Sequence, residues 1–130
     1  MTAAAKPYDP NNIFARILRG DISCNKVFEN EHVLAFRDIH PQAPVHVLVI
    51  PKGAYVDMDD FTARASADEI AALMRATGEI ARAEGIAQSG YRVLSNCGAN
   101  GGQEVPHLPL HVVGGRTLGR MLQNARTANI

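Results

Sequence analysis

The chain has 130 residues, of which 46% are hydrophobic and 20% are charged, and its formal net charge is +0. These values are typical of one globular domain, and the missing basic excess argues against a nucleic-acid-binding surface. No apolar run approaches the roughly 20 residues of a membrane span, and the N-terminus contains no apolar signal region, so we expect a cytoplasmic protein. Cys24 and Cys97 form no Cys-x-x-Cys pair, which makes a disulfide scaffold or a cysteine zinc site a poor interpretation.

The first half of the chain predicts one short helix and three strands. Residues 1–10 are expected to be a flexible lead-in. Asp9 or Asn11 caps a short helix over 13–19, and Gly20 ends it. Apolar and alternating runs then predict strands at 26–29, 32–38 and 46–50.

The second half predicts a long helix followed by two strands. Residues 53–65 form a connection, and Ser66 with Glu69 makes a capping box that opens a helix running to Glu84. Residues 119–130 are expected to be a tail. Strands are predicted at 91–95 and 108–113. Consecutive short strands joined by turns indicate an antiparallel sheet, and hence an α+β fold.

Two histidines lie close together near the C-terminal end of this pattern. The stretch from Gln103 to Arg116 reads QEVPHLPLHVVGGR. Because side chains alternate along a strand, His107, Pro109 and His111 would share one face, with apolar residues on the other. The preceding loop, residues 95–102, is rich in Gly and Asn and can turn backbone N–H groups toward an anion. The combination predicts a site for a phosphoryl group.

A carboxylate lies at the end of the second predicted strand. Asp38 precedes a loop that Pro41 and Pro44 make rigid. An ionised carboxylate only accepts hydrogen bonds, so Asp38 could bind both hydroxyls of a ribose. Capping a turn is the alternative role for an Asp at this position.

Several separated motifs resemble those of the histidine triad (HIT) superfamily, in the same order. The run from His107 is similar to its His-x-His-x-His signature, and FRDIHPQAPVH at 36–46, followed by VLVIPK, resembles the nucleotide-binding segment of its Hint branch. The resemblance covers about residues 11–118, which we take as the domain. It implies a HIT-like fold with a five-stranded antiparallel sheet, one long and one short helix, and a homodimer whose sheet continues across the interface. The middle histidine, the family's nucleophile, is replaced by Pro109.

The resemblance also implies a role for particular residues. Family enzymes attack the α-phosphorus of a nucleotide with a histidine nitrogen, which splits one displacement into two. The matching catalytic positions are His46, His107 and His111. The positions matching a purine nucleoside monophosphate site are Phe14, Ile22, Phe36, Asp38, Ile39, Asn96, Gly102, Gln103, Glu104 and His111. No cofactor is implied, and Glu104 would act either as an acid near the leaving group or as a solvated surface residue.

Three hypotheses follow for the function. The first is a nucleoside phosphoramidate hydrolase that is impaired because proline has no basic nitrogen with which to attack phosphorus. The second is a non-catalytic nucleotide-binding or regulatory module, since Asp38, Asn96 and the Gly loop do not depend on position 109. The third, which we favour least, is a metal site made of His46, His107 and His111.

Overall fold

The computed structural model describes residues 6–122, and this part of the chain contains four helices and five strands. In chain order the elements are α1 (Ile13–Leu18), β1 (Lys26–Glu29), β2 (Val33–Arg37), β3 (Val45–Pro51), α2 (Met58–Arg64), α3 (Ala67–Ala83), β4 (Tyr91–Leu94), α4 (Gly98–Gly101) and β5 (Leu110–Gly114). Within residues 6–122, no helix is both long enough and apolar enough to cross a membrane.

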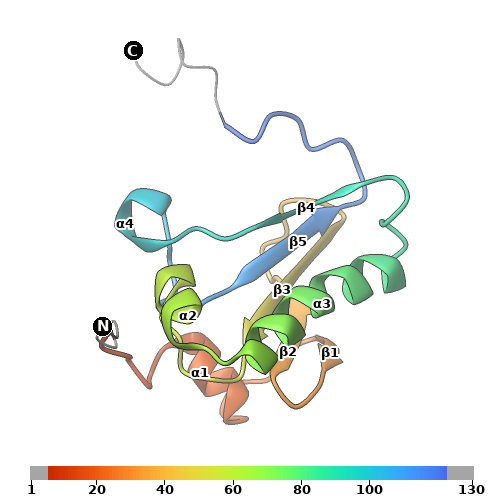
Figure 1. Cartoon of the computed structure of the whole chain (residues 1–130). Helices are drawn as coiled ribbons and strands as arrows, with labels where there is room; N and C mark the ends of the chain where they lie inside the picture. Colours follow the sequence, from red (N-terminus) through yellow and green to blue (C-terminus); the bar gives the residue numbers. More distant parts are fainter. Residues whose placement is uncertain (1–5, 123–130) are drawn as a thin grey trace, which may run out of the picture.

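The strands form a single five-stranded sheet in the order β1-β2-β3-β5-β4, and every neighbouring pair is antiparallel (Figure 1). This confirms the predicted α+β class and the five-stranded antiparallel sheet. The pairing of β3 with β5 joins distant parts of the chain, because it sets Leu48 opposite His111 and His46 opposite Val113. The two strands that carry histidines therefore lie side by side in the sheet.

The long helix α3 begins where the sequence predicts it. The Ser66 side chain accepts a hydrogen bond from the Glu69 backbone N–H, and the Glu69 carboxylate caps the Ser66 N–H in return. The structure also adds two short helices to the predicted pair. One of them, α2, begins in the connection at Asp57, whose side chain accepts from the Asp60 N–H. A helix of 7 residues is too short to show the apolar period on which such predictions depend.

The last strand begins later than predicted. β5 starts at Leu110 rather than at residue 108, since Pro109 has no N–H to give to the ladder. The alternation nevertheless continues before the strand, because Leu108 belongs to the same core cluster as Leu110 and Val112. The His107 ring packs edge to face on Phe14 and is 0% exposed. The expectation that Leu108, Leu110 and Val112 share one face is therefore met, and His107 lies on the other face, where it is covered.

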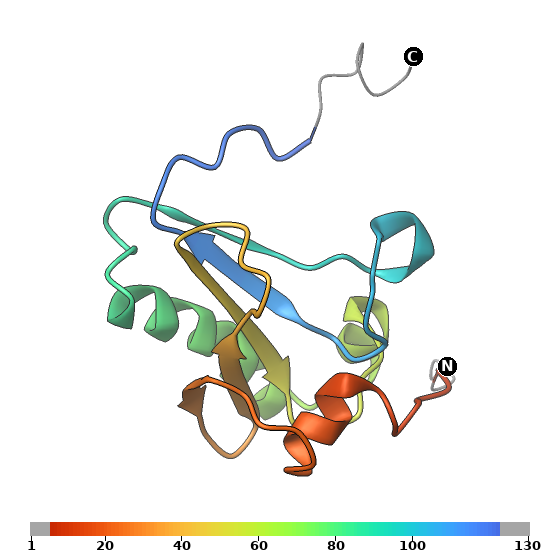
Figure 2. The ribbon, with the colours of Figure 1, turned by 180° about the vertical axis from the view of Figure 1, so that it is seen from behind.

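Different helices cover the two faces of the sheet. Figure 1 shows α3 against one face, and the reverse view in Figure 2 shows α1 on the other side. The core under α3 includes Val47, Val49, Leu73, Ile80 and Val112. The smaller core beside α1 includes Phe14, Leu34, Phe36, Leu48 and Ile50. By alternation, His46 and His111 lie on the α1 side, next to Leu48.

The predicted lead-in is tied to the domain over the part that the structure describes. The Lys6 ammonium lies 2.8 Å from Asp57 and 2.9 Å from Asp59. The Tyr8 hydroxyl lies 2.6 Å from Nδ1 of His107. Residues 1–5 of the expected flexible segment, and 123–130 of the expected tail, lie outside the described residues.

His107 is a buried histidine whose ring nitrogens both have partners. Its Nε2 lies 2.8 Å from the Pro51 carbonyl oxygen. A carbonyl can only accept, so Nε2 carries the proton and Nδ1 accepts from the Tyr8 hydroxyl. Burial lowers the pKa of His107 below its ordinary 6.5, and the Pro51 contact offsets only part of this effect.

We expect the buried imidazole of His107 to make stability pH-dependent. Because the pKa of His107 is lowered in the folded state, the unfolded chain takes up a proton first, and stability is lost as the pH falls below about 6.5. The His107→Gln variant, whose amide can donate to Pro51 and accept from Tyr8, should lose part of this dependence. Denaturant unfolding from about pH 7.5 to about pH 5.5 measures it.

The matched control is His40→Gln, because His40 is exposed. It should keep the pH dependence of the wild type. Equal dependence in the wild type and in His107→Gln would show that His107 is not held neutral in the folded state.

Candidate functional site

A cavity of about 620 Å³ lies on the α1 side of the sheet. Its walls come from α1, from the ends of β2 and β3, from the loop after β4 and from the segment that leads into β5. Of the residues predicted to bind a nucleotide, nine line it: Phe14, Ile22, Phe36, Asp38, Ile39, Asn96, Gly102, Glu104 and His111. His46 and Pro109 line it as well. Segments that are far apart in the sequence thus contribute to one concave site.

Two predicted site residues lie elsewhere. His107 is enclosed between Tyr8 and Pro51 and does not line the cavity. The side chain of Gln103 is occupied by the backbone: it accepts from the Gly98 N–H at 2.9 Å and donates to the Val56 carbonyl at 2.7 Å. Gln103 therefore braces the loop and is not among the residues that line the cavity.

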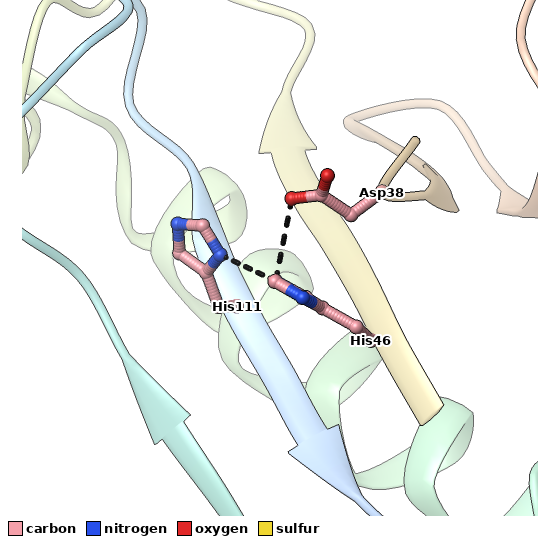
Figure 3. Close-up of side chains that lie close together, drawn as sticks. All are labelled: Asp38, His46 and His111. Atoms are coloured by element: carbon pink, nitrogen blue, oxygen red, sulfur yellow. Dashed lines mark hydrogen bonds and ion pairs between the residues drawn. The ribbon is translucent and has the colours of Figure 1, made fainter. Parts of the chain in front are cut away.

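The centre of the site is a pair of histidines from neighbouring strands (Figure 3). Nε2 of His46, on β3, lies 2.9 Å from Nδ1 of His111, on β5. The Asp38 carboxylate, which follows β2, lies 3.4 Å from the same His46 nitrogen. The other oxygen of Asp38 accepts a hydrogen bond from the His40 backbone N–H at 2.8 Å. Asp38 therefore caps its turn and also lines the cavity, so the capping role does not exclude the predicted contact with a ribose.

The pKa of His111 lies below its ordinary value of 6.5. Burial lowers the pKa of His111, and the neighbouring His46 lowers it further, while the Asp38 and Glu104 charges act in the opposite direction. Glu104 is exposed at the rim of the cavity. The cavity also meets Arg37, but its guanidinium pairs with Glu84 at 2.6 and 3.1 Å. The site consequently offers an anion N–H donors and imidazole rings, since the one Arg among its lining residues is paired with Glu84.

Part of the cavity wall is apolar. The rings of Phe14 and Phe36 meet edge to face, with centroids 5.6 Å apart. Ile22 continues this wall, and Ile39 is 82% exposed beside it. A flat aromatic ligand gains from contact with such a surface, because burial of apolar area is favourable.

The loop after β4 provides the backbone-rich side of the site. Asn96 and Gly102 line the cavity at either end of α4. Gly102 has φ +79°, a left-handed conformation that favours glycine, and it closes the turn that leads back toward β5. The Ser95 hydroxyl donates to the Pro109 carbonyl at 2.9 Å and so joins this loop to the segment before β5.

Three side chains at the centre have the chemistry of metal ligands. The ligand atoms of Asp38, His46 and His111 all lie within 4.8 Å of one another. The predicted set of His46, His107 and His111 is not brought together, since His107 is buried elsewhere. A histidine bound to a metal through one nitrogen normally donates the other N–H to an acceptor. Here Nδ1 of His46 faces the Gln42 backbone N–H, itself a donor, at 3.0 Å. The arrangement suits a hydrogen-bonded pair better than a metal ion.

The sequence analysis did not identify all of the lining. Gln42 and the segment 23–25 contribute to the cavity. The prolines around Gln42 indicate a rigid loop, but they do not tell where its N–H groups point. Segment 23–25 shows no recognisable pattern, and only the path of the chain after α1 places it there.

Comparison with known proteins identifies the family. The HIT domain model matches residues 19–118. The chain is 69% identical to an uncharacterised HIT-like protein of Azospirillum brasilense, over 91% of this chain and 97% of that protein. It is 42% identical to the purine nucleoside phosphoramidase of Escherichia coli K12, over 85% and 92% of the two chains. A HIT family hydrolase from Clostridium thermocellum, 36% identical, superposes with a TM-score of 0.81 over 86% and 97% of the two chains. The chain therefore belongs to the HIT family.

Proposed function

We propose that this protein binds purine nucleoside monophosphates and hydrolyses nucleoside phosphoramidates only weakly. One observation carries the proposal: Asp38, Asn96 and His111 line the same cavity, although they come from distant parts of the chain. These are an acceptor for a sugar and two donors for a phosphate. An apolar wall completes the set that a nucleoside monophosphate requires.

The parts of the ligand fit different regions of the cavity. The Asp38 carboxylate accepts hydrogen bonds from the ribose hydroxyls. Phe14, Phe36 and their neighbours Ile22 and Ile39 pack against the purine. Asn96, the backbone at Gly102 and the His111 ring lie around the α-phosphate. An apolar wall of this kind accepts any purine, so we do not distinguish adenine from guanine.

The proposed activity rests on the Hint-branch motifs and on the Escherichia coli relative, whose name is purine nucleoside phosphoramidase. We place the family's nucleophile at Pro109, which lines the cavity in this chain. Its ring has no basic nitrogen, so the nucleotidyl–histidine intermediate cannot form there. His46 and His111 remain to hold and orient the phosphoryl group. The protein would then keep the binding function and lose most of the rate.

A non-catalytic nucleotide-binding module is the alternative. It differs from an impaired hydrolase only in having no turnover, because the binding residues are the same. Calorimetry with AMP tests the binding function that both share, and the absence of a binding signal would contradict both.

We expect Pro109→His to restore hydrolysis. With adenosine phosphoramidate as substrate, release of AMP should rise by several orders of magnitude, on the order of 10⁴, because loss of a nucleophile commonly costs that much. The matched control is Pro109→Ala, which removes the proline ring without adding an imidazole and should leave the rate low. Wild-type turnover at ordinary enzyme rates would disprove the impairment, and an inactive Pro109→His would show that the nucleophile position is misassigned.

Glu104 is expected to weaken the binding of a free nucleotide. It is an exposed carboxylate at the cavity rim, and its charge would repel the phosphate. Glu104→Gln should tighten AMP binding about threefold at low ionic strength, and the gain should shrink as salt is added. Glu79→Gln, an exposed position on α3, is the control for the change in net charge. Equal affinities at all salt concentrations would mean that Glu104 is only a solvated surface residue.

We also propose a homodimer in which the sheet continues across the interface at β4. This strand lies at one edge of the sheet, and Tyr91 and Val93 on it are each 39% exposed. An edge strand offers unpaired N–H and C=O groups to a second copy.

A charge on this edge should separate the subunits. Val93→Lys is expected to sediment as a monomer at concentrations where the wild type sediments as a dimer, since two like charges would meet at the interface. Ala63→Lys adds the same charge at an exposed position on α2 and should remain dimeric. A monomeric wild type would refute the dimer, and a dimeric Val93→Lys would place the interface elsewhere.

A further inference from the structure

The proton positions in the histidine pair can be deduced from one neighbouring group. The backbone N–H of Gln42 lies 3.0 Å from Nδ1 of His46. A backbone N–H is always a donor, so Nδ1 must be the acceptor and cannot carry a proton while this bond is kept. The neutral His46 ring therefore has its proton on Nε2.

The proton of His46 then decides that of its partner. Nε2 of His46 faces Nδ1 of His111 at 2.9 Å and the Asp38 carboxylate at 3.4 Å. Two nitrogens at this distance cannot both carry a proton between them, so Nδ1 of His111 accepts. The proton of the neutral His111 ring is on Nε2, on the side of the ring away from His46 (Figure 3).

The loop that carries the Gln42 N–H is held from several directions. The Arg116 guanidinium donates to the Gln42 carbonyl at 2.9 Å. The Asp38 N–H donates to the His46 carbonyl at 3.0 Å and closes the base of the loop. Pro41 and Pro44 restrict the backbone within it. The direction of the N–H is thus set by the loop and not by the histidines.

The outer nitrogen of His111 is free to meet a ligand. Within residues 6–122, every buried side-chain nitrogen or oxygen has a hydrogen-bond partner. Nε2 of His111 has no partner among these residues. This atom is therefore not buried and is accessible to solvent. His111 also lines the cavity.

We infer that the Gln42 backbone N–H fixes the tautomers of both histidines, so that His111 presents an N–H donor, and not a lone pair, to an anionic oxygen in the cavity. The inference rests on the proposed function only for the identity of that oxygen, a phosphate oxygen. It makes His111 a binding group and Gln42 a positioning residue. It also explains why His111 does not replace the missing nucleophile, since a nitrogen that carries a proton has no lone pair for phosphorus.

The tautomers can be measured directly in the ligand-free protein. Long-range proton–nitrogen correlation NMR distinguishes protonated from unprotonated ring nitrogens. For the wild type we expect unprotonated Nδ1 and protonated Nε2 in both His46 and His111. A proton on Nδ1 of either ring would overturn the inference.

Two substitutions separate the backbone group from the side chain. Gln42→Pro removes the N–H, and Gln42→Ala keeps it. Gln42→Ala should retain the wild-type tautomers, whereas Gln42→Pro should give a mixture in both rings and bind AMP about tenfold more weakly than Gln42→Ala. Unchanged tautomers in a folded Gln42→Pro would contradict the role of this N–H.

The test distinguishes this inference from the proposed function. If Gln42→Pro does not fold, the wild-type spectrum still decides the tautomers. If the tautomers are as expected but AMP gives no binding signal by calorimetry, the proton arrangement holds and the nucleotide-binding proposal fails.

Discussion

The site depends on the antiparallel pairing of β3 with β5. This pairing places His46 and His111 on the same face, diagonally across two strands, with 2.9 Å between their ring nitrogens. The register of this pairing must be kept, because side chains alternate between the two faces with a period of two. A slip of one residue would place the histidines under α3 and valines in the cavity. The apolar residues that alternate with the histidines fill the α3 core, so the burial of that core also holds the site in register.

One face of the sheet carries the larger apolar core, and the other face carries the cavity. The α3 face is dry and apolar, whereas α1 covers only part of the other face and shares the cavity with loops. Where polar groups are buried they are paired, and residues 6–122 contain no buried side-chain nitrogen or oxygen without a hydrogen bond. His107 illustrates the rule, since it is fully buried but bonded at both nitrogens. It secures the segment before β5 and does not line the cavity.

In the proposed site, the groups that bind a nucleotide are retained, whereas the histidine that would attack phosphorus is replaced by proline. Sugar, base and phosphate would each be met by groups that do not involve position 109, while the position proposed for the nucleophile holds a ring without a basic nitrogen. With the tautomers that we propose, the neighbouring His111 would be a poor substitute, because its outward nitrogen would carry the proton. The arrangement of His46 and His111 would then explain both the binding of a phosphate and the poor turnover.

The sequence by itself determined the class of fold, the capping of α3 and most of the lining of the cavity. These features follow from local patterns, such as alternation, the Ser66–Glu69 capping box and motifs that resemble the HIT family. It did not reveal α2, the late start of β5, the complete burial of His107 or the bracing role of Gln103. Each of these depends on contacts between segments far apart in the chain, as in the bonds from His107 to Pro51 and from Gln103 to Val56. Only the tertiary structure decided which histidine pairs with His46, because the register of β3 against β5 brings His111 next to it. It also decided where the Gln42 N–H points, because that direction depends on how the loop closes.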